Sequence, residues 1–245
     1  MALGTFIHLE HDGKLLLVDS KGNGPQIPIK GRNNSKEGKG WIFRLPTESE
    51  VDSMGIKWSM KGRYNLEIGE SSTIVIMGQP EIPWPENWAW KDDVISDSCI
   101  HPAARESVYR SIHRLVSKVV IRDQNKNILL AKVKRGHFIG CWTLPGGYLD
   151  HNEEPTIGAV RETMEELGIT IEIDNSNTSI VSQKIFNEAG ISFVSFTYLV
   201  EVNSNELEFN LKIDEIEEIG WFKRNEAISS ASSWFDLEAI KKLTE

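Results

Sequence analysis

GGYLDHNEEPTIGAVRETMEELGI, residues 146–169, places five glutamates within the fourteen residues from Glu153 to Glu166. Pro155 suits the first turn of a helix, where its missing N–H costs little. Apolar residues then recur at the spacing of a buried helix face, namely at Ile157, Val160, Met164 and Leu167. We therefore predict an amphipathic helix that starts near Pro155 and packs on a core.

Three glutamates share the neighbouring face of this helix. Glu162, Glu165 and Glu166 are spaced i, i+3 and i+4, so their carboxylates lie close together and repel one another in a bare helix. Such a cluster is stable when a cation joins it, and hard carboxylate oxygens suit Mg²⁺ or Mn²⁺. The simpler alternative is a solvated acidic helix face, which is usual for a run of charge.

The residues before the helix favour the metal site. Arg161 can reach back to Glu153 in the preceding loop and fix the loop to the helix. Gly146 and Gly147 allow close approach of the backbone, so the carbonyl group of Gly146 is a further candidate ligand.

The spacing of the whole stretch argues against a chance arrangement. Its fixed residues are Gly147, Glu153, Arg161, Glu162, Glu165, Glu166 and Gly168. Their pattern resembles the Nudix box, G-x5-E-x7-R-E-U-x-E-E-x-G-U, in which U is aliphatic and Thr163 is the one departure. By residue frequencies such a match arises by chance in roughly one of 10⁸–10⁹ windows.

This resemblance covers about residues 113–245 and implies an α/β/α sandwich that hydrolyses a diphosphate linked to another, usually nucleoside-derived, group. It implies divalent Mg²⁺ (or Mn²⁺) as cofactor, and Glu162 as a catalytic base for the attacking water. The implied metal ligands are Glu162, Glu165, Glu166 and the Gly146 carbonyl. The implied structural supports of the box are Gly147, Glu153, Arg161 and Gly168.

Further site residues are predicted outside the box. By the same resemblance a later loop supplies another carboxylate, and Glu215 is the candidate, with Glu217 or Glu218 as alternatives. The remaining candidates are substrate-binding residues: Arg135 and His137 in a basic loop, and Phe186 and Tyr198 on strands. A solvated loop is the alternative for the first pair, and a place in the core is the alternative for the aromatic pair.

The chain is expected to be α/β, with a smaller β-rich N-terminal domain at 1–90, a connector at 91–112 and the Nudix domain at 113–245. The predicted strands span 115–121, 128–133, 169–173, 179–186, 191–202, 207–211 and 216–222, and a closing helix spans 225–243. Residues 6–31 echo residues 119–147, each with a strand, a polar turn and an L-L-containing strand. A degenerate Nudix-like duplication and an unrelated β-rich domain both remain open.

Composition limits the partners. The net charge of −9 argues against nucleic-acid binding, and Cys99 and Cys141 form no C-x-x-C pair. The sequence shows neither a signal peptide nor a membrane-length apolar run, which predicts a cytoplasmic protein without a membrane partner. The expected partner is a small-molecule nucleotide substrate, and a homodimer stays open. The alternative function is a non-catalytic nucleotide-sensing regulator, which the complete acidic set disfavours.

Overall fold

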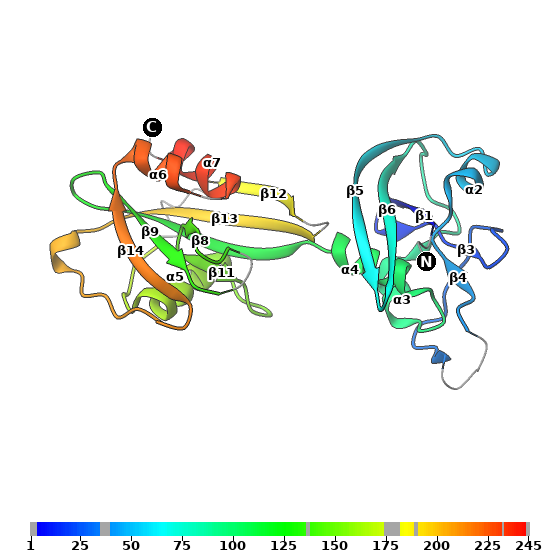
Figure 1. Cartoon of the computed structure of the whole chain (residues 1–245), viewed down its shortest axis with the longest axis horizontal. Helices are drawn as coiled ribbons and strands as arrows, with labels where there is room; N and C mark the ends of the chain where they lie inside the picture. Colours follow the sequence, from blue (N-terminus) through cyan, green and yellow to red (C-terminus); the bar gives the residue numbers. More distant parts are fainter. Residues whose placement is uncertain are drawn as a thin grey trace. The chain divides into compact units, whose positions relative to one another are not determined.

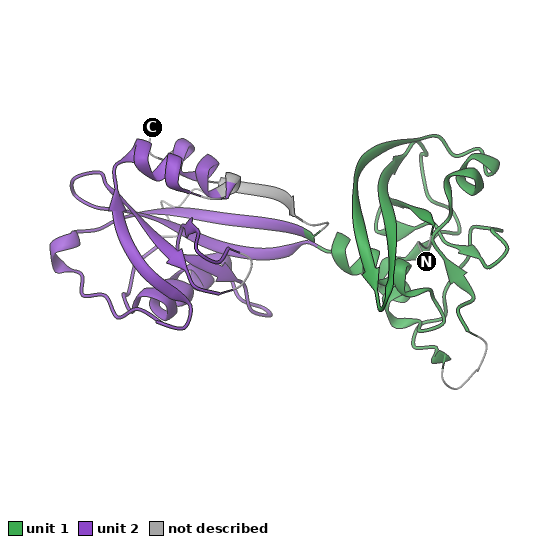
Figure 2. Ribbon diagram, viewed as in Figure 1, with its two compact units in different colours: residues 1–112, 188–191 green, residues 113–187, 192–245 purple. Residues whose placement is uncertain are grey.

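The computed structural model describes residues 4–34, 40–135, 138–173, 182–188, 191–231 and 233–243, without the side chains of 182–188, 234, 235 and 243 (Figure 1). The chain divides into two compact units (Figure 2). Unit 1 is Met1–Ile112 with Glu188–Ile191, and unit 2 is His113–Asn187 with Ser192–Glu245. The predicted substrate residue His137 lies outside the described residues, and so does the side chain of Phe186.

Unit 2 is built on a mixed sheet whose centre is β8 (Arg114–Arg122). Its other strands are β9 (Ile128–Val133), β10 (Trp142–Thr143), β11 (Gly146–Tyr148), β12 (Ser182–Glu188), β13 (Ile191–Glu201) and β14 (Ile216–Phe222). β8 pairs with β9 and β11 antiparallel and with β13 in parallel, while β14 pairs with β9. Because β8 lies inside the sheet and helices cover both sheet faces, its β-branched run is buried on both faces.

Helices cover both faces of this sheet (Figure 1). Alternate strand residues point to opposite faces. Val119 and Ile121 pack with α5 (Pro155–Leu167), whereas Val120 packs with α6 (Arg224–Ser230) and α7 (Trp234–Leu243). This is the α/β/α sandwich that the box predicted.

The buried face of α5 differs from the predicted apolar stripe. Ile157 and Met164 are 59% and 44% exposed, and the buried residues are Gly158, Ala159, Thr163 and Leu167. Small residues let the helix lie close to the sheet. The Thr163 hydroxyl donates to the Ala159 carbonyl at 2.8 Å, so it is buried at no hydrogen-bonding cost. The one departure from the box pattern is thus a buried helix residue.

Three other sequence predictions need correction. Residues 169–173 and 207–211 form no strand, and a short 3₁₀ helix, η1 (Ser204–Glu206), precedes the second segment. Residues 207–211 instead run beside the end of α5, where Asn210 N–H donates to the Leu167 carbonyl at 2.9 Å. The closing helix is two helices, because the backbone is extended at Ala231 and bridges to Trp142.

Unit 1 contains a second sheet with the strand order β5-β6-β1-β2-β7, beside a small β3–β4 pair. Its strands are β1 (Thr5–His11), β2 (Lys14–Leu15), β3 (Val18–Asp19), β4 (Phe43–Arg44), β5 (Trp58–Ile68), β6 (Ser71–Pro80) and β7 (Ala89–Trp90). Its helices are α2 (Glu48–Ser53), α3 (Lys91–Ser96) and α4 (Pro102–Ser111). Trp88 is buried in this unit, whereas Trp84 and Trp90 flank the ammonium group of Lys14.

The two sheets share one topology. In each, a first strand forms a hairpin with the second and lies parallel to a later strand, as β1 does with β6 and β8 with β13. In each, a final strand pairs with the second hairpin strand, as β7 does with β2 and β14 with β9. A Leu-Pro pair contacts the first strand in both: Ile7 N–H donates to the Pro46 carbonyl at 2.8 Å, and Val119 N–H to the Pro145 carbonyl at 3.0 Å. This correspondence favours the duplication over an unrelated domain.

The helix that corresponds to α5 is shortened in unit 1. α2 has 6 residues and α5 has 13. The acids of α2 are Glu48, Glu50 and Asp52, without the adjacent glutamates of α5. Glu50 receives two hydrogen bonds from the Arg44 guanidinium at 2.8 and 2.6 Å. The same carboxylate accepts from Thr47 N–H at 2.8 Å and so caps the helix.

The Arg44 pair gives unit 1 an acid-sensitive contact. Hydrogen bonds from Arg44 lower the pKa of Glu50 from 4.5 to about 2. A lowered folded-state pKa contributes stability that is complete above the unfolded pKa and is lost as the pH falls through the folded one. We expect Glu50→Gln to destabilise the full chain by about 1 kcal/mol at pH 7 and by less at pH 2, where the Glu50 carboxylate is partly protonated. Calorimetry from pH 2 to pH 7 measures this, and Glu48→Gln is the control for loss of charge from the same turn. A pH-independent effect of Glu50→Gln would contradict it.

Candidate metal site

The two box glycines fit two different close contacts. β11 pairs with β8 so that Gly146 lies opposite Lys118 and Gly147 opposite Ser117. Gly146 has a φ of +134°, and a Cβ atom there would lie 2.2 Å from the Ser117 carbonyl oxygen. A Cβ atom on Gly147 would lie 2.7 Å from the carboxylate of Glu162. The glycines therefore let the loop lie between β8 and the acidic face of α5.

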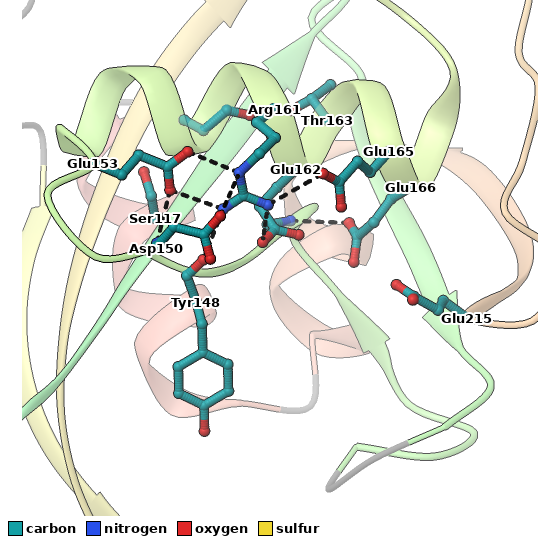
Figure 3. A network of polar contacts seen from close by, with 12 residues as sticks. Ser117, Tyr148, Asp150, Glu153, Arg161, Glu162, Thr163, Glu165, Glu166 and Glu215 are labelled. Carbon is teal, nitrogen blue, oxygen red and sulfur yellow. Dashed lines mark hydrogen bonds and ion pairs between the residues drawn. The ribbon is translucent and has the colours of Figure 1, made fainter.

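Arg161 joins this loop to the helix (Figure 3). Its guanidinium donates to both carboxylate oxygens of Glu153 at 2.7 and 2.8 Å and to the Tyr148 carbonyl at 2.9 Å. It also donates to Glu162 at 2.9 Å and lies 3.4 Å from Glu165. The planar fork thus holds the loop and orients two box carboxylates at once.

Two of the box carboxylates, Glu162 and Glu166, are partly buried although they are acids. Burial raises the pKa of Glu166 to about 7, and the charges of Glu162 and Glu215 add to the rise. Gly146 N–H donates to Glu166 at 3.0 Å. Burial also raises the pKa of Glu162, against the hydrogen bond from Arg161, while Glu165 and Glu215 repel its charge. These carboxylates share one region, and Arg161, which contacts Glu162 and Glu165, is shared with Glu153.

Glu215 is the late-loop acid that faces the box. It lies on the Glu166 side of the cluster (Figure 3), and its charge acts on both Glu162 and Glu166. Its side chain is 18% exposed. Glu217 and Glu218 are about half exposed and pair instead with Lys132, at 3.2 and 3.0 Å.

In the part of the chain that the structure describes, no three His, Cys, Asp or Glu side chains converge tightly enough to hold a metal ion. The partners of the carboxylates explain this spread: Arg161 holds Glu162 and Glu165, and Gly146 N–H holds Glu166. The donor set still fits a hard cation, because the carboxylate oxygens share one region, are partly buried and repel one another.

The predicted substrate residues have different surroundings. Arg135 is exposed and pairs with Glu215. Tyr198 is 3% exposed and lies in the core between the sheet and α5, which is the alternative that its strand position left open.

One buried ion pair behind the box was not predicted. The ammonium group of Lys118 lies 3.0 Å from a carboxylate oxygen of Asp236 and 3.2 Å from the Leu144 carbonyl. The same Asp236 oxygen accepts from Leu144 N–H at 3.1 Å. Asp236 on α7 therefore holds Leu144, two residues before Gly146, in place. The available signal was a lysine inside the apolar run LVSKVVI, because a buried lysine needs a partner.

The family assignment agrees with this geometry. Residues 112–243 match the family model for the NUDIX domain. The chain therefore belongs to the NUDIX family. None of the described helices is long and apolar enough to cross a membrane.

Similar proteins match about half of the chain. Nudix hydrolase 2 of Arabidopsis thaliana is 31% identical over 119 residues, which are 48% of this chain and 41% of that protein. An ADP-ribose pyrophosphatase of Methanocaldococcus jannaschii is 30% identical over 131 residues, 54% of this chain and 73% of that protein. The crystal structure of a MutT NUDIX hydrolase from Burkholderia pseudomallei has 28% identity and a TM-score of 0.47, and covers 54% of this chain and 99% of that one.

Gly168 offers a direct test of how the site is assembled. It ends α5 with a φ of +71°, and a Cβ atom there would lie 2.6 Å from the Cβ of Asn210. We expect Gly168→Ala to cost about 3 kcal/mol, from left-handed backbone strain and from displacement of the late loop. Gly140→Ala is the matched control, since Gly140 has a φ of +75° in open space. Denaturant unfolding of both variants compares them, and equal losses would exclude the steric contribution.

Proposed function

We propose that this chain hydrolyses the diphosphate linkage of a nucleoside diphosphate derivative. We propose further that Mg²⁺ or Mn²⁺ is held by Glu162, Glu165, Glu166 and the Gly146 carbonyl. The observation that carries the proposal is the group of buried, mutually repelling carboxylates beside Gly146. Cations and a phosphate group complete such a site, because each offsets the charge of the other.

The roles of the chain's own residues follow from their positions. A bound divalent ion would offset the charge of the diphosphate and make an attacking water more acidic. Glu162 is partly buried and oriented by Arg161, so it is placed to accept the proton of that water. As the new oxygen–phosphorus bond forms, the bridging phosphorus–oxygen bond breaks, and the leaving phosphate takes the negative charge. Glu153 and Arg161 hold the loop that presents Gly146.

The names of the relatives support a class of substrates rather than a single compound. One is called an ADP-ribose pyrophosphatase and another, from Proteus vulgaris, an 8-oxo-dGTP diphosphatase. These names share a nucleoside attached to a diphosphate and differ in the group beyond it. We therefore propose a nucleoside diphosphate linked to a further group, such as a dinucleotide, an ADP-ribose-like compound or a nucleoside triphosphate.

The box glutamates provide the first functional test. We expect Glu165→Gln and Glu166→Gln each to lower kcat at least about 100-fold, because each removes charge that stabilises the transition state through the metal. Thermal stability without metal should hold or rise, since repulsion is relieved. Glu154→Gln is the control, because it removes a charge from the loop just before α5. Near-normal turnover of both box variants at saturating Mg²⁺ would contradict the metal site.

The substrate is found by a screen of the full chain. ADP-ribose, dinucleotides, nucleotide sugars and nucleoside triphosphates are tested with Mg²⁺ or Mn²⁺, and products are separated by chromatography. We expect cleavage within the diphosphate for at least one class, and its loss when a chelator removes the metal. Cleavage that persists in the chelator would refute the proposed mechanism.

A further inference from the structure

Two cations hold Glu215 beside the box carboxylates. The ammonium group of Lys212 lies 2.8 Å from Oε1 of Glu215, and the guanidinium of Arg135 contacts the same oxygen. Lys212 and Arg135 are 43% and 64% exposed, whereas Glu215 is 18% exposed. The acid is therefore covered, while both cations keep surface that faces solvent.

Backbone hydrogen bonds fix this arrangement. Lys212 N–H donates to the Glu166 carbonyl at 3.0 Å, which ties the segment to the end of α5. Glu215 N–H donates to the Lys212 carbonyl at 2.8 Å, so the turn folds Glu215 back toward Lys212. Lys134 N–H donates to the Glu215 carbonyl at 2.7 Å, which brings Arg135 to the same place. Such anchoring distinguishes the group from a chance surface ion pair.

Glu215 has two alternative sources of positive charge. In the structure its partners are Lys212 and Arg135, yet its charge also acts on Glu162 and Glu166. A divalent ion among those carboxylates attracts Glu215 more strongly than a monovalent side chain does. Once Glu215 turns to the ion, both cations are left with exposed, uncompensated charge beside the site.

We propose that Lys212 and Arg135, which contact Glu215 in the structure, bind the phosphate oxygens of the substrate when Glu215 turns to a bound metal ion. This inference rests on the proposed function and adds Lys212 as a substrate-binding residue. It couples the two ligands: metal binding releases the cations that the diphosphate needs, so each ligand strengthens the binding of the other.

If Glu215 exchanges Lys212 for the metal, removing the charge of Lys212 should affect metal binding and diphosphate binding in opposite directions. Lys212 competes with the metal for Glu215, so Lys212→Gln leaves Mn²⁺ binding unchanged or strengthens it. The same variant lacks a phosphate contact, so binding of a diphosphate weakens. A residue that merely kept the loop folded would weaken the binding of both ligands.

Titration calorimetry on the full chain measures both affinities. Mn²⁺ is titrated alone, and methylenediphosphonate, which resists hydrolysis, is titrated at saturating Mn²⁺. For Lys212→Gln we expect a Kd for Mn²⁺ between unchanged and about threefold lower, and a Kd for methylenediphosphonate about tenfold higher. Lys212→Arg keeps the charge and should bind methylenediphosphonate like the wild type.

Lys132→Gln is the matched control, because Lys132 on β9 pairs with two other glutamates, Glu217 and Glu218 on β14. It should alter neither affinity by more than about twofold. The inference is overturned if Lys212→Gln weakens Mn²⁺ binding, if it leaves methylenediphosphonate binding unchanged, or if Lys132→Gln shows the opposite-sign pattern instead. Failure of the wild-type chain to bind Mn²⁺ would instead remove the proposed metal site itself.

Discussion

Repulsion among carboxylates is the constraint around which unit 2 is organised. Glu162, Glu165, Glu166 and Glu215 act on one region, and two of them are raised in pKa by burial. Each has a partner that limits the cost: Arg161 for Glu162 and Glu165, Gly146 N–H for Glu166, and Lys212 with Arg135 for Glu215. The loop before α5 and the turn after η1 are shaped by these partnerships. A site built this way stores unfavourable electrostatic energy, which the proposed cation and phosphate group would relieve.

The sequence predicted the local parts of this arrangement well. A helix period and a proline located α5, and short spacing brought Arg161 to Glu153. The buried face of α5 was missed because Thr163 looks polar, yet its hydroxyl is satisfied inside the helix. Contacts between distant residues were not predictable, because no local pattern records them. Lys118 and Asp236 lie 118 positions apart, and the Lys212 turn depends on hydrogen bonds to the end of α5.

Unit 1 shows what the same topology becomes without the acidic cluster. Its Leu45–Pro46 pair and its Gly55 occupy places that correspond to Leu144–Pro145 and Gly168 in unit 2. Arg44 and Glu50 form a close ion pair, so Glu50 already has its counter-charge within unit 1. The sheet order is retained although the helix is about half as long. The strand pairing of this fold therefore does not depend on the acidic cluster. The acidic cluster, in contrast, depends on the loops that place its carboxylates.

The hydrogen bond that Leu144 N–H donates to Asp236 also has a consequence for biosynthesis. The box emerges from the ribosome well before Asp236, which follows Leu144 by 92 residues. Until then Lys118 lacks the buried counter-charge that it has in the finished fold, and burying it alone is costly. The loop that presents Gly146 is consequently fixed only after α7 has been translated. A nascent chain would thus carry its acidic helix before the loop at Gly146 is held in place.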